Sequence, residues 1–312
     1  MASTIKNVIV IGASGSIGPH IVSALLENGF SVSVLTRITS SATFPSTVTV
    51  HRTDYSHASL VDAFKGQDAV VSTIATFSAH QQADIIDAAV AAGVKRFIPS
   101  EYGVDTSLPQ LTELLLPALP KQKTIEYLRT KESAGLSWTA VIVGGFFDWA
   151  LQIPGFLGWN IPARTATIFD GGDVEFEMTN VAQIARGVAA VLSSVHIEDT
   201  KNKYIYINSF TVTQNQILAA LEEATADKFA VTHGTKAELF KNAQELLKSG
   251  KTSSSGSPAG SLELITAAIY GYGGLNEYSK TKGLWNEKLG LPKEDLNETV
   301  ARIVNGSKTS EK

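Results

Sequence analysis

Three glycines, spaced three residues apart after an apolar run, are the first residues in the chain with a candidate role in binding a ligand. Gly12, Gly15 and Gly18 follow the run at residues 8–11, and Pro19 opens an amphipathic segment. Glycine lets a backbone turn sharply and approach a ligand closely, and a helix N-terminus offers free N–H groups to a phosphate. The pattern predicts a strand, a turn and a helix around a dinucleotide pyrophosphate, the alternative being an ordinary loop. The other residues assigned to this turn are Ser14, Ser16 and Ile17.

A basic residue ends the next predicted strand, residues 31–37. In a strand–helix–strand unit this tip lies beside the adenosine ribose, where an acidic residue would bind the hydroxyls of NAD. Arg37 stands there instead, with Thr36, Thr39, Ser40 and Ser41 around it. This favours NADPH; the alternative is a solvated arginine at a strand end.

A proton-transfer group is needed as well, because a nicotinamide cofactor brings only the hydride. It belongs at the carboxyl ends of the middle strands or on the helix between them. Tyr127 and Lys131 have the spacing of the tyrosine–lysine pair of short-chain dehydrogenases, but a four-residue spacing is common in helices. Lys121 and Lys123 lie nearer the end that faces the cofactor, and either one is otherwise an ordinary surface lysine. The remaining candidates are residues 76–80 and Ser100, Glu101 and Tyr102.

Six apolar strands alternate with helical segments over the first half of the chain. This alternation is typical of an α/β doubly wound parallel sheet, the Rossmann arrangement. Residues 1–150 are predicted to form the NAD(P)-binding domain and residues 151–312 a smaller mixed α/β substrate domain, with segments of about 165–208 as candidates to pack back on the sheet. The six predicted strands are 8–11, 31–37, 47–54, 68–74, 95–100 and 137–143.

The second half carries an aromatic segment, a turn signal and a Ser/Gly-rich loop. The aromatic segment after Gly144 is expected to wall a substrate pocket or to form a seam between domains. The Asp170-Gly-Gly-Asp173 sequence between 166–169 and 174–178 predicts a hairpin, and residues 248–261 an insertion or lid. Candidate substrate residues are Phe77, His80, Phe147, Trp149, Tyr270 and Tyr272.

The composition of the chain argues against several kinds of partner and several kinds of catalysis. The 312 residues are 44% hydrophobic, with 26 basic and 30 acidic residues and a net charge of -4, so neither nucleic acid nor an acidic membrane is an expected partner. The absence of cysteine excludes disulfides and thiolate catalysis. The scattered histidines predict no metal site, and we expect no signal peptide, no membrane span and a cytoplasmic location.

Several of these segments together resemble the NmrA-like and isoflavone reductase-like family of atypical short-chain dehydrogenases. The resemblance rests on the glycine turn, on Asp54, on residues 68–73 and above all on the Val94-Lys-Arg-Phe-Ile-Pro-Ser-Glu-Tyr-Gly103 sequence. The family includes phenylcoumaran benzylic ether and pinoresinol–lariciresinol reductases. In the plant enzymes a lysine about one helix after the Pro-Ser-Glu element is the proposed general acid or base, and the resemblance places Lys123 there.

The same resemblance implies NADP(H) as cofactor and a small, aromatic substrate. It assigns the 2′-phosphate to Arg37, and Asp54, Thr73, Ile74, Lys123 and Phe146 are also placed at the cofactor. Two departures concern the substrate end, where Gly144 replaces an asparagine and Ala75 a glycine of the plant reductases. The resulting hypothesis is an NADPH-dependent reductase of an aromatic or conjugated molecule, an enone, quinone methide or benzylic ether. The alternative is a dinucleotide-sensing regulator with little or no catalysis.

Overall fold

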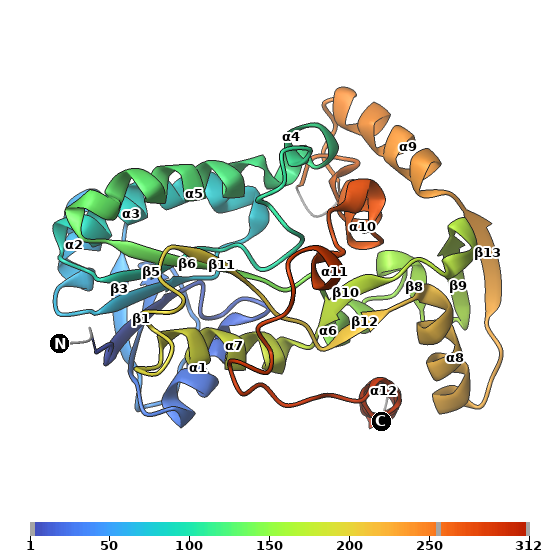
Figure 1. The fold of residues 1–312 in the computed structure, drawn as a ribbon, viewed down its shortest axis with the longest axis horizontal. Coiled ribbons are helices and arrows are strands. Elements are labelled where there is room, and N and C mark those ends of the chain that lie inside the picture. The colour runs from blue at the N-terminus through green and yellow to red at the C-terminus, as the bar shows by residue number, and fades with distance from the viewer. Residues whose placement is uncertain (1–3, 254–256, 310–312) are drawn as a thin grey trace.

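A twisted parallel sheet forms the centre of the computed structural model, which describes residues 4–253 and 257–309. Seven strands pair side by side in this part of the chain, in the order β11-β6-β5-β4-β1-β2-β3 (Figure 1). Their apolar runs are buried on both faces, as parallel strands covered by helices require. The strands are β1 (Asn7–Ile11), β2 (Ser31–Arg37), β3 (Thr49–Thr53), β4 (Ala69–Ser72), β5 (Arg96–Ile98), β6 (Ser137–Ile142) and β11 (Lys203–Tyr206).

Helices cover both faces of this sheet (Figure 1). Alternate residues of β1 enter opposite cores, since Val8 and Val10 pack with one helix layer and Ile9 and Ile11 with the other. This is the period of two expected of a strand. The first layer contains α1 (Gly18–Glu27) and α7 (Val181–Leu192), and the second α2 (His57–Phe64), α3 (Gln82–Ala91) and α5 (Leu119–Lys131).

The seventh strand comes from the second half of the chain. β11 pairs in parallel with β6, from Lys203 opposite Thr139 to Tyr206 opposite Ile142. The buried guanidinium of Arg96 supports this return, because it donates to Thr139 Oγ1 at 2.8 Å and to Thr200 Oγ1 at 3.2 Å. Residues 181–206 therefore add a helix and a strand to the sheet layers, while the domain division at residue 150 stays a prediction.

Two three-stranded sheets build the rest of the fold, and they correct the predicted hairpin. The segments on either side of Asp170-Gly-Gly-Asp173 lie in different sheets. Asn215 Nδ2 donates to Gly171 O at 2.8 Å and to Asp173 Oδ1 at 2.7 Å, which holds the turn against a helix and leads the chain out of the first sheet. One sheet contains β7 (Gly145–Phe146), β10 (Phe176–Thr179) and β12 (Phe210–Val212), and the other β8 (Trp159–Asn160), β9 (Thr165–Phe169) and β13 (Ala230–Gly234).

The remaining helices and 3-10 turns connect the strands of the three sheets or follow them in the chain. Part of the predicted loop 248–261 lies outside the described residues. In the rest of it, Thr252 and Pro258 form an isolated β-bridge, and a helix begins at Ser261. The α-helices are α4 (Leu111–Leu114), α6 (Phe147–Leu151), α8 (Gln214–Thr225), α9 (Lys236–Lys248), α10 (Ser261–Ile269), α11 (Tyr278–Thr281) and α12 (Leu296–Thr309). The 3-10 turns are η1 (Thr76–Gln81), η2 (Leu116–Ala118), η3 (Glu132–Ala134), η4 (Phe156–Gly158), η5 (Asp170–Gly172) and η6 (Tyr272–Gly274).

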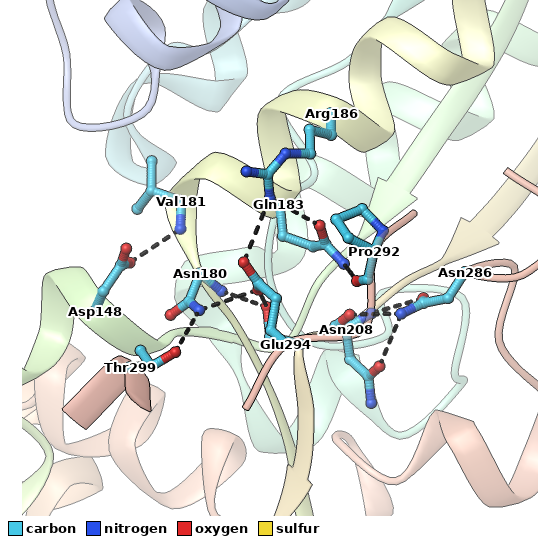
Figure 2. A network of polar contacts seen from close by, with 11 residues as sticks. Asp148, Asn180, Val181, Gln183, Arg186, Asn208, Asn286, Pro292, Glu294 and Thr299 are labelled. Atoms are coloured by element: carbon cyan, nitrogen blue, oxygen red, sulfur yellow. Dashed lines mark hydrogen bonds and ion pairs between the residues drawn. The ribbon is translucent and has the colours of Figure 1, made fainter. Parts of the chain in front are cut away.

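A C-terminal segment before α12 ties these parts together (Figure 2). Glu294 accepts hydrogen bonds from Asn180 Nδ2 at 3.0 Å and from the hydroxyl of Ser209. Gln183 donates to the carbonyl of Pro292 at 2.8 Å. Asn180 precedes α7 but makes no side-chain cap: its Nδ2 donates to Glu294, and its Oδ1 has no hydrogen-bond partner in the described part of the chain.

Candidate functional site

The glycine turn has the backbone geometry that the sequence predicted. Gly12 has a φ of +78°, and a Cβ there would lie 2.7 Å from Thr73 Oγ1. A Cβ on Gly18 would lie 2.4 Å from the carbonyl oxygen of Gly12. Side chains are excluded at both positions, because the turn packs directly against the end of β4. The first turn of α1, which carries no side-chain cap at Ile17, is left with N–H groups available to a phosphate.

An elongated cleft of about 670 Å³ begins at this turn. It runs along the carboxyl ends of β1, β2 and β4, where ligands bind in open α/β sheets. Six predicted cofactor residues line it, namely Gly12, Ser14, Gly15, Arg37, Thr73 and Ile74. The other lining residues were not predicted to bind the cofactor; they are Tyr55, Leu60, Ala75, Ser78, Gln81, Asp84 and Ile85.

Arg37 is exposed at one end of the cleft, with Tyr55 beside it. No ion pair joins Arg37 to a carboxylate within the described part of the chain. The neighbouring Arg52 instead donates to Ser40 O at 2.7 Å. Burial raises the pKa of Tyr55 against the opposing effect of Arg37. A cleft with a glycine cradle at one point and an unpaired guanidinium at its tip fits a dinucleotide with a 2′-phosphate.

The remaining predicted cofactor residues lie outside this cleft. Ser16 is exposed and Ile17 and Gly18 are buried at the start of α1. Asp54 is exposed, and its Oδ1 accepts from Ser56 N at 2.9 Å before α2. Phe146 lines a different cavity.

That cavity, of about 220 Å³, lies next to the cleft, since Ala75 lines the cleft and the following residue, Thr76, lines the cavity. Its walls come from the ends of β5 and β6, from η2 and α5, and from the second half of the chain. The lining residues are Thr76, Glu101, Tyr102, Gly103, Val104, Thr106, Leu115, Ala118, Lys121, Gly144, Gly145, Phe146, Trp149, Phe156, Leu262, Ile265 and Ile269.

Two buried ionisable side chains face each other in this cavity. Lys121 is 6% exposed, and its Nζ donates to the carbonyl oxygen of Glu101 at 2.7 Å. The hydroxyl of Thr106 donates to Glu101 Oε2. Burial raises the pKa of Glu101 to about 7, against the opposing effects of Lys121 and Thr106. Burial also lowers the pKa of Lys121, opposed by Glu101, so its ammonium gives up a proton more readily than that of an exposed lysine.

A hydrogen-bonded chain holds the peptide before Glu101 in place. The Ser100 hydroxyl donates to Ile74 O at 2.6 Å, after β4, and Ser100 N donates to Gln82 Oε1 at 2.9 Å, on α3. Gln82 Nε2 in turn donates to Thr124 Oγ1 at 3.3 Å, on α5. The elements that bring Glu101 and Lys121 together are therefore fixed to one another.

Lys123, the predicted general acid or base, does not line the cavity. It is exposed, and it borders a separate surface hollow together with His80. Two positions along an α-helix differ by about 200° in direction, so Lys121 and Lys123 point to opposite sides of α5. The structure therefore supports Lys121, not Lys123, as the lysine of the cavity.

The Tyr127 and Lys131 pair is engaged elsewhere. The Tyr127 hydroxyl donates to Asp87 Oδ1 at 2.7 Å, and Lys131 Nζ lies 2.7 Å from the same oxygen. Asp87 belongs to α3, so the pair joins two helices on the outside of the sheet. This position is incompatible with the catalytic role considered for the pair.

Among the predicted substrate residues, Trp149 alone lines the cavity. Its ring packs edge-on against Phe146 and Phe156, with centroids 6.1 and 5.6 Å away. Phe147 and Tyr270 are buried in the core of the second half. Phe77 is exposed, His80 borders the hollow beside Lys123, and Tyr272 packs on Phe240. The aromatic segment is thus partly a pocket wall and partly a core seam.

The structure explains why residue 144 is a glycine here and not the asparagine of the plant reductases. Its φ is +65°, and a Cβ there would lie 2.1 Å from the carbonyl oxygen of Glu177. Any side chain would collide with β10. This part of the cavity wall therefore differs from the plant pattern in backbone packing and not only in chemistry.

Three apolar residues of α10, Leu262, Ile265 and Ile269, complete the cavity. They follow Lys121 by about 140 positions in the chain, and no local pattern connects them to it. Glu101 and Lys121 stood among the sequence candidates, but only packing distinguishes them from their neighbours.

No cluster of three or more His, Asp or Glu residues able to hold a metal occurs within residues 4–253 and 257–309. In the same ranges no helix has the length and apolar character needed to cross a membrane.

Comparison with known proteins assigns the family. The model of the NmrA-like family matches residues 4–269. This chain belongs to the NmrA-like family. The NmrA-like protein is 40% identical over 308 residues to "Oxidoreductase aprR" of Aspergillus flavus, covering 97% of this chain and 100% of that protein. It is 30% identical over 262 residues to "Isoflavone reductase homolog IRL" of Zea mays, covering 78% and 82% of the two chains. The prediction of an enzyme of the oxidoreductase class is confirmed.

Solved structures bear out the predicted fold of the NmrA-like protein. AtPrR2 with NADP+ and (+)pinoresinol aligns with a TM-score of 0.70 at 21% identity, over 97% of this chain and 100% of that one. The leucoanthocyanidin reductase–NADPH complex of Vitis vinifera aligns with a TM-score of 0.74 at 17% identity, over 96% and 99%. Both neighbours hold the cofactor that the sequence predicted here.

Proposed function

We propose that this NmrA-like protein is an NADPH-dependent reductase of a small aromatic or conjugated molecule, and that Lys121 is its general acid or base. The observation that carries the proposal is the position of Lys121. It is buried in the wall of a largely apolar cavity, and this cavity lies next to the cleft that contains the glycine turn.

The cofactor-binding part of the proposal rests on three features of the cleft. The N-terminal turn of α1 would bind the pyrophosphate, and Arg37 the 2′-phosphate. Thr73 and Ile74 would lie along the middle of the dinucleotide, on the way to the cavity. Bound NADPH supplies a hydride to an electron-poor carbon of the substrate.

The lysine would handle the proton that this reaction requires. Hydride addition to a conjugated system leaves negative charge on an oxygen, which the Lys121 ammonium neutralises by donating a proton. Burial lowers the pKa of Lys121 and so makes this donation easier near neutral pH. Phe146, Trp149 and Phe156 would hold the substrate ring and exclude water.

A substrate panel tests the function directly. The oxidation of NADPH and of NADH is followed at 340 nm with aromatic enones, quinone methides and benzylic ethers. We expect turnover of at least one class, with NADPH preferred. Binding of NADPH without turnover of any class would instead support the dinucleotide sensor.

A further inference from the structure

Glu101 lines the cavity, and one oxygen of its carboxylate is buried without a partner in the described part of the chain. Glu101 is fully buried, and its Oε2 accepts from Thr106, whereas Oε1 has no hydrogen bond within residues 4–253 and 257–309. An unpaired buried acceptor costs about 1–3 kcal/mol, and such atoms are rare in folded proteins. Its presence in a ligand cavity indicates that the ligand brings a donor.

The surroundings keep this oxygen available. Thr106 fixes the carboxyl group through the other oxygen, and Lys121 bonds the Glu101 backbone carbonyl instead of the carboxylate. A Cβ on Gly103 would lie 3.3 Å from Glu101 O and 3.8 Å from Lys121 Nζ. Glycine at this position therefore avoids crowding the hydrogen bond between Lys121 Nζ and the Glu101 carbonyl. Tyr102 lines the same cavity, and its hydroxyl is also buried without a partner in the described part of the chain.

The rest of the lining is mostly apolar. A ligand that fits these walls has an apolar body and a polar end that meets Lys121 and Glu101. The apolar side chains are Val104, Leu115, Ala118, Phe146, Trp149, Phe156, Leu262, Ile265 and Ile269.

We propose that Glu101 is a specificity-determining residue, whose Oε1 accepts a hydrogen bond from a hydroxyl group of the substrate. The cavity then selects small phenolic or enolic molecules over their ethers. This proposal rests on the proposed function only in taking the cavity as the substrate site. Its test is equilibrium binding, which needs no hydride transfer.

Protonation of Glu101 adds a second way to test the proposal. The charged or titratable groups near its carboxylate are Lys121, Asp105, Tyr204 and Tyr206. Burial raises the pKa of both tyrosines, so they stay neutral. Since the pKa of Glu101 is about 7, the carboxyl acquires a proton at mildly acidic pH and then no longer prefers a donor.

The experiment measures the binding of a matched ligand pair to the NADP+-saturated protein by calorimetry. The probes are 4-propylphenol and its methyl ether, 4-propylanisole. At about pH 8 we expect the phenol to bind about ten-fold more tightly, the effect of one hydrogen bond to a charged group. At about pH 5.5 the ratio falls towards one.

Glu101→Gln removes the acceptor selectively. If the amide oxygen takes the Thr106 bond, the amide nitrogen stands in place of Oε1, so the preference disappears or reverses towards the ether. Glu126→Gln, the same change on the exposed face of α5, keeps the ten-fold preference. Should Glu101→Gln fail to fold, the pH series on the unmodified protein still decides.

Equal binding of the two probes to the unmodified protein, binding of neither, or an unchanged preference in Glu101→Gln would overturn the proposal. A phenol preference without turnover of any panel substrate would leave Glu101 assigned and the reductase function wrong. Turnover of a panel substrate with no phenol preference would support the reductase function and overturn the role of Glu101.

Discussion

Lys121 Nζ donates a 2.7 Å hydrogen bond to the backbone carbonyl of Glu101 and not to its carboxylate. The two ionisable groups therefore influence each other electrostatically without forming a contact ion pair. Lysine can then turn towards a substrate without breaking a salt bridge. This separation makes the roles of the two residues experimentally distinguishable.

Lys121→Met should lower kcat by about 10²–10⁴-fold, the usual contribution of a general acid or base. The side chain keeps its length but loses the proton. Lys123→Met, two residues away on the opposite face of α5, should change kcat by less than about two-fold. Steady-state rates with the best substrate of the panel measure both. The reverse pattern would restore Lys123 as the catalytic residue.

Arg37→Ala should weaken NADPH binding by at least about ten-fold, because a charge-assisted bond to the 2′-phosphate is lost. NADH, which lacks that phosphate, should bind with nearly unchanged affinity. Fluorescence titration with both cofactors measures the ratio. Arg52→Ala serves as the control, since Arg52 already donates to Ser40 O. An equal loss for NADPH and NADH would show that Arg37 acts on the fold and not on the phosphate.

Glu101→Gln should change how stability depends on pH. The pKa of Glu101 rises from 4.5 to about 7 on folding, so the folded protein binds the proton more tightly than the unfolded chain. Its stabilising contribution is complete below about pH 4.5 and is lost as pH rises to about 7, a difference of about 3 kcal/mol in the free energy of unfolding. Urea denaturation at pH 5 and pH 8 should show this loss in the unmodified protein and not in the variant. If the free energy of unfolding changed with pH by the same amount in both proteins, the raised pKa of a buried Glu101 carboxyl would be contradicted.

Gly144→Asn, which restores the residue of the plant reductases, should destabilise the protein by at least about 2 kcal/mol more than Gly155→Asn. Both glycines have positive φ, +65° and +82°, but a Cβ would meet Glu177 O at 2.1 Å only at Gly144. At Gly155 no atom lies within 4 Å. Because both positions have positive φ, the difference in Tm between the two variants measures the effect of the collision with Glu177 O alone. Equal shifts in Tm would mean that the wall of the cavity can move.

Glu294→Ala should lower the free energy of unfolding by about 2–4 kcal/mol. The change removes the 3.0 Å acceptor of the buried Asn180 amide, which keeps only the 3.4 Å bond to Thr299 Oγ1 (Figure 2). It also removes the bond from Ser209. Glu298→Ala, on an exposed part of α12, should have less than about 0.5 kcal/mol of effect. Denaturant unfolding measures both. A small effect at Glu294 would show that the C-terminal segment is not required to hold α7 against the second half.

Local sequence was sufficient for the cofactor end of the molecule. The glycine turn, the apolar strands of the sheet and Arg37 at the tip of β2 all follow from neighbouring residues. The turn can be recognised locally because it requires backbone angles that glycine adopts. The end of β2 can be recognised because strands and helices alternate along this part of the chain. The family motif from Val94 to Gly103 likewise placed the strand that carries Glu101.

Tertiary packing decided the substrate end. Lys121 and Lys123 look alike in the sequence, and only the rotation of α5 on the sheet buries one and exposes the other. The pKa of Glu101 depends on burial beneath residues from η2, α5 and β11, and the cavity is closed by α10, far along the chain. The sequence offered residues 165–208 only as candidates to return to the sheet, and the pairing of β11 with β6 decided this. The expected hairpin was divided between two sheets because contacts with distant residues outweighed the local turn signal. Burial and electrostatic environment are properties of the assembled fold, so the sequence could name the candidates but not choose among them.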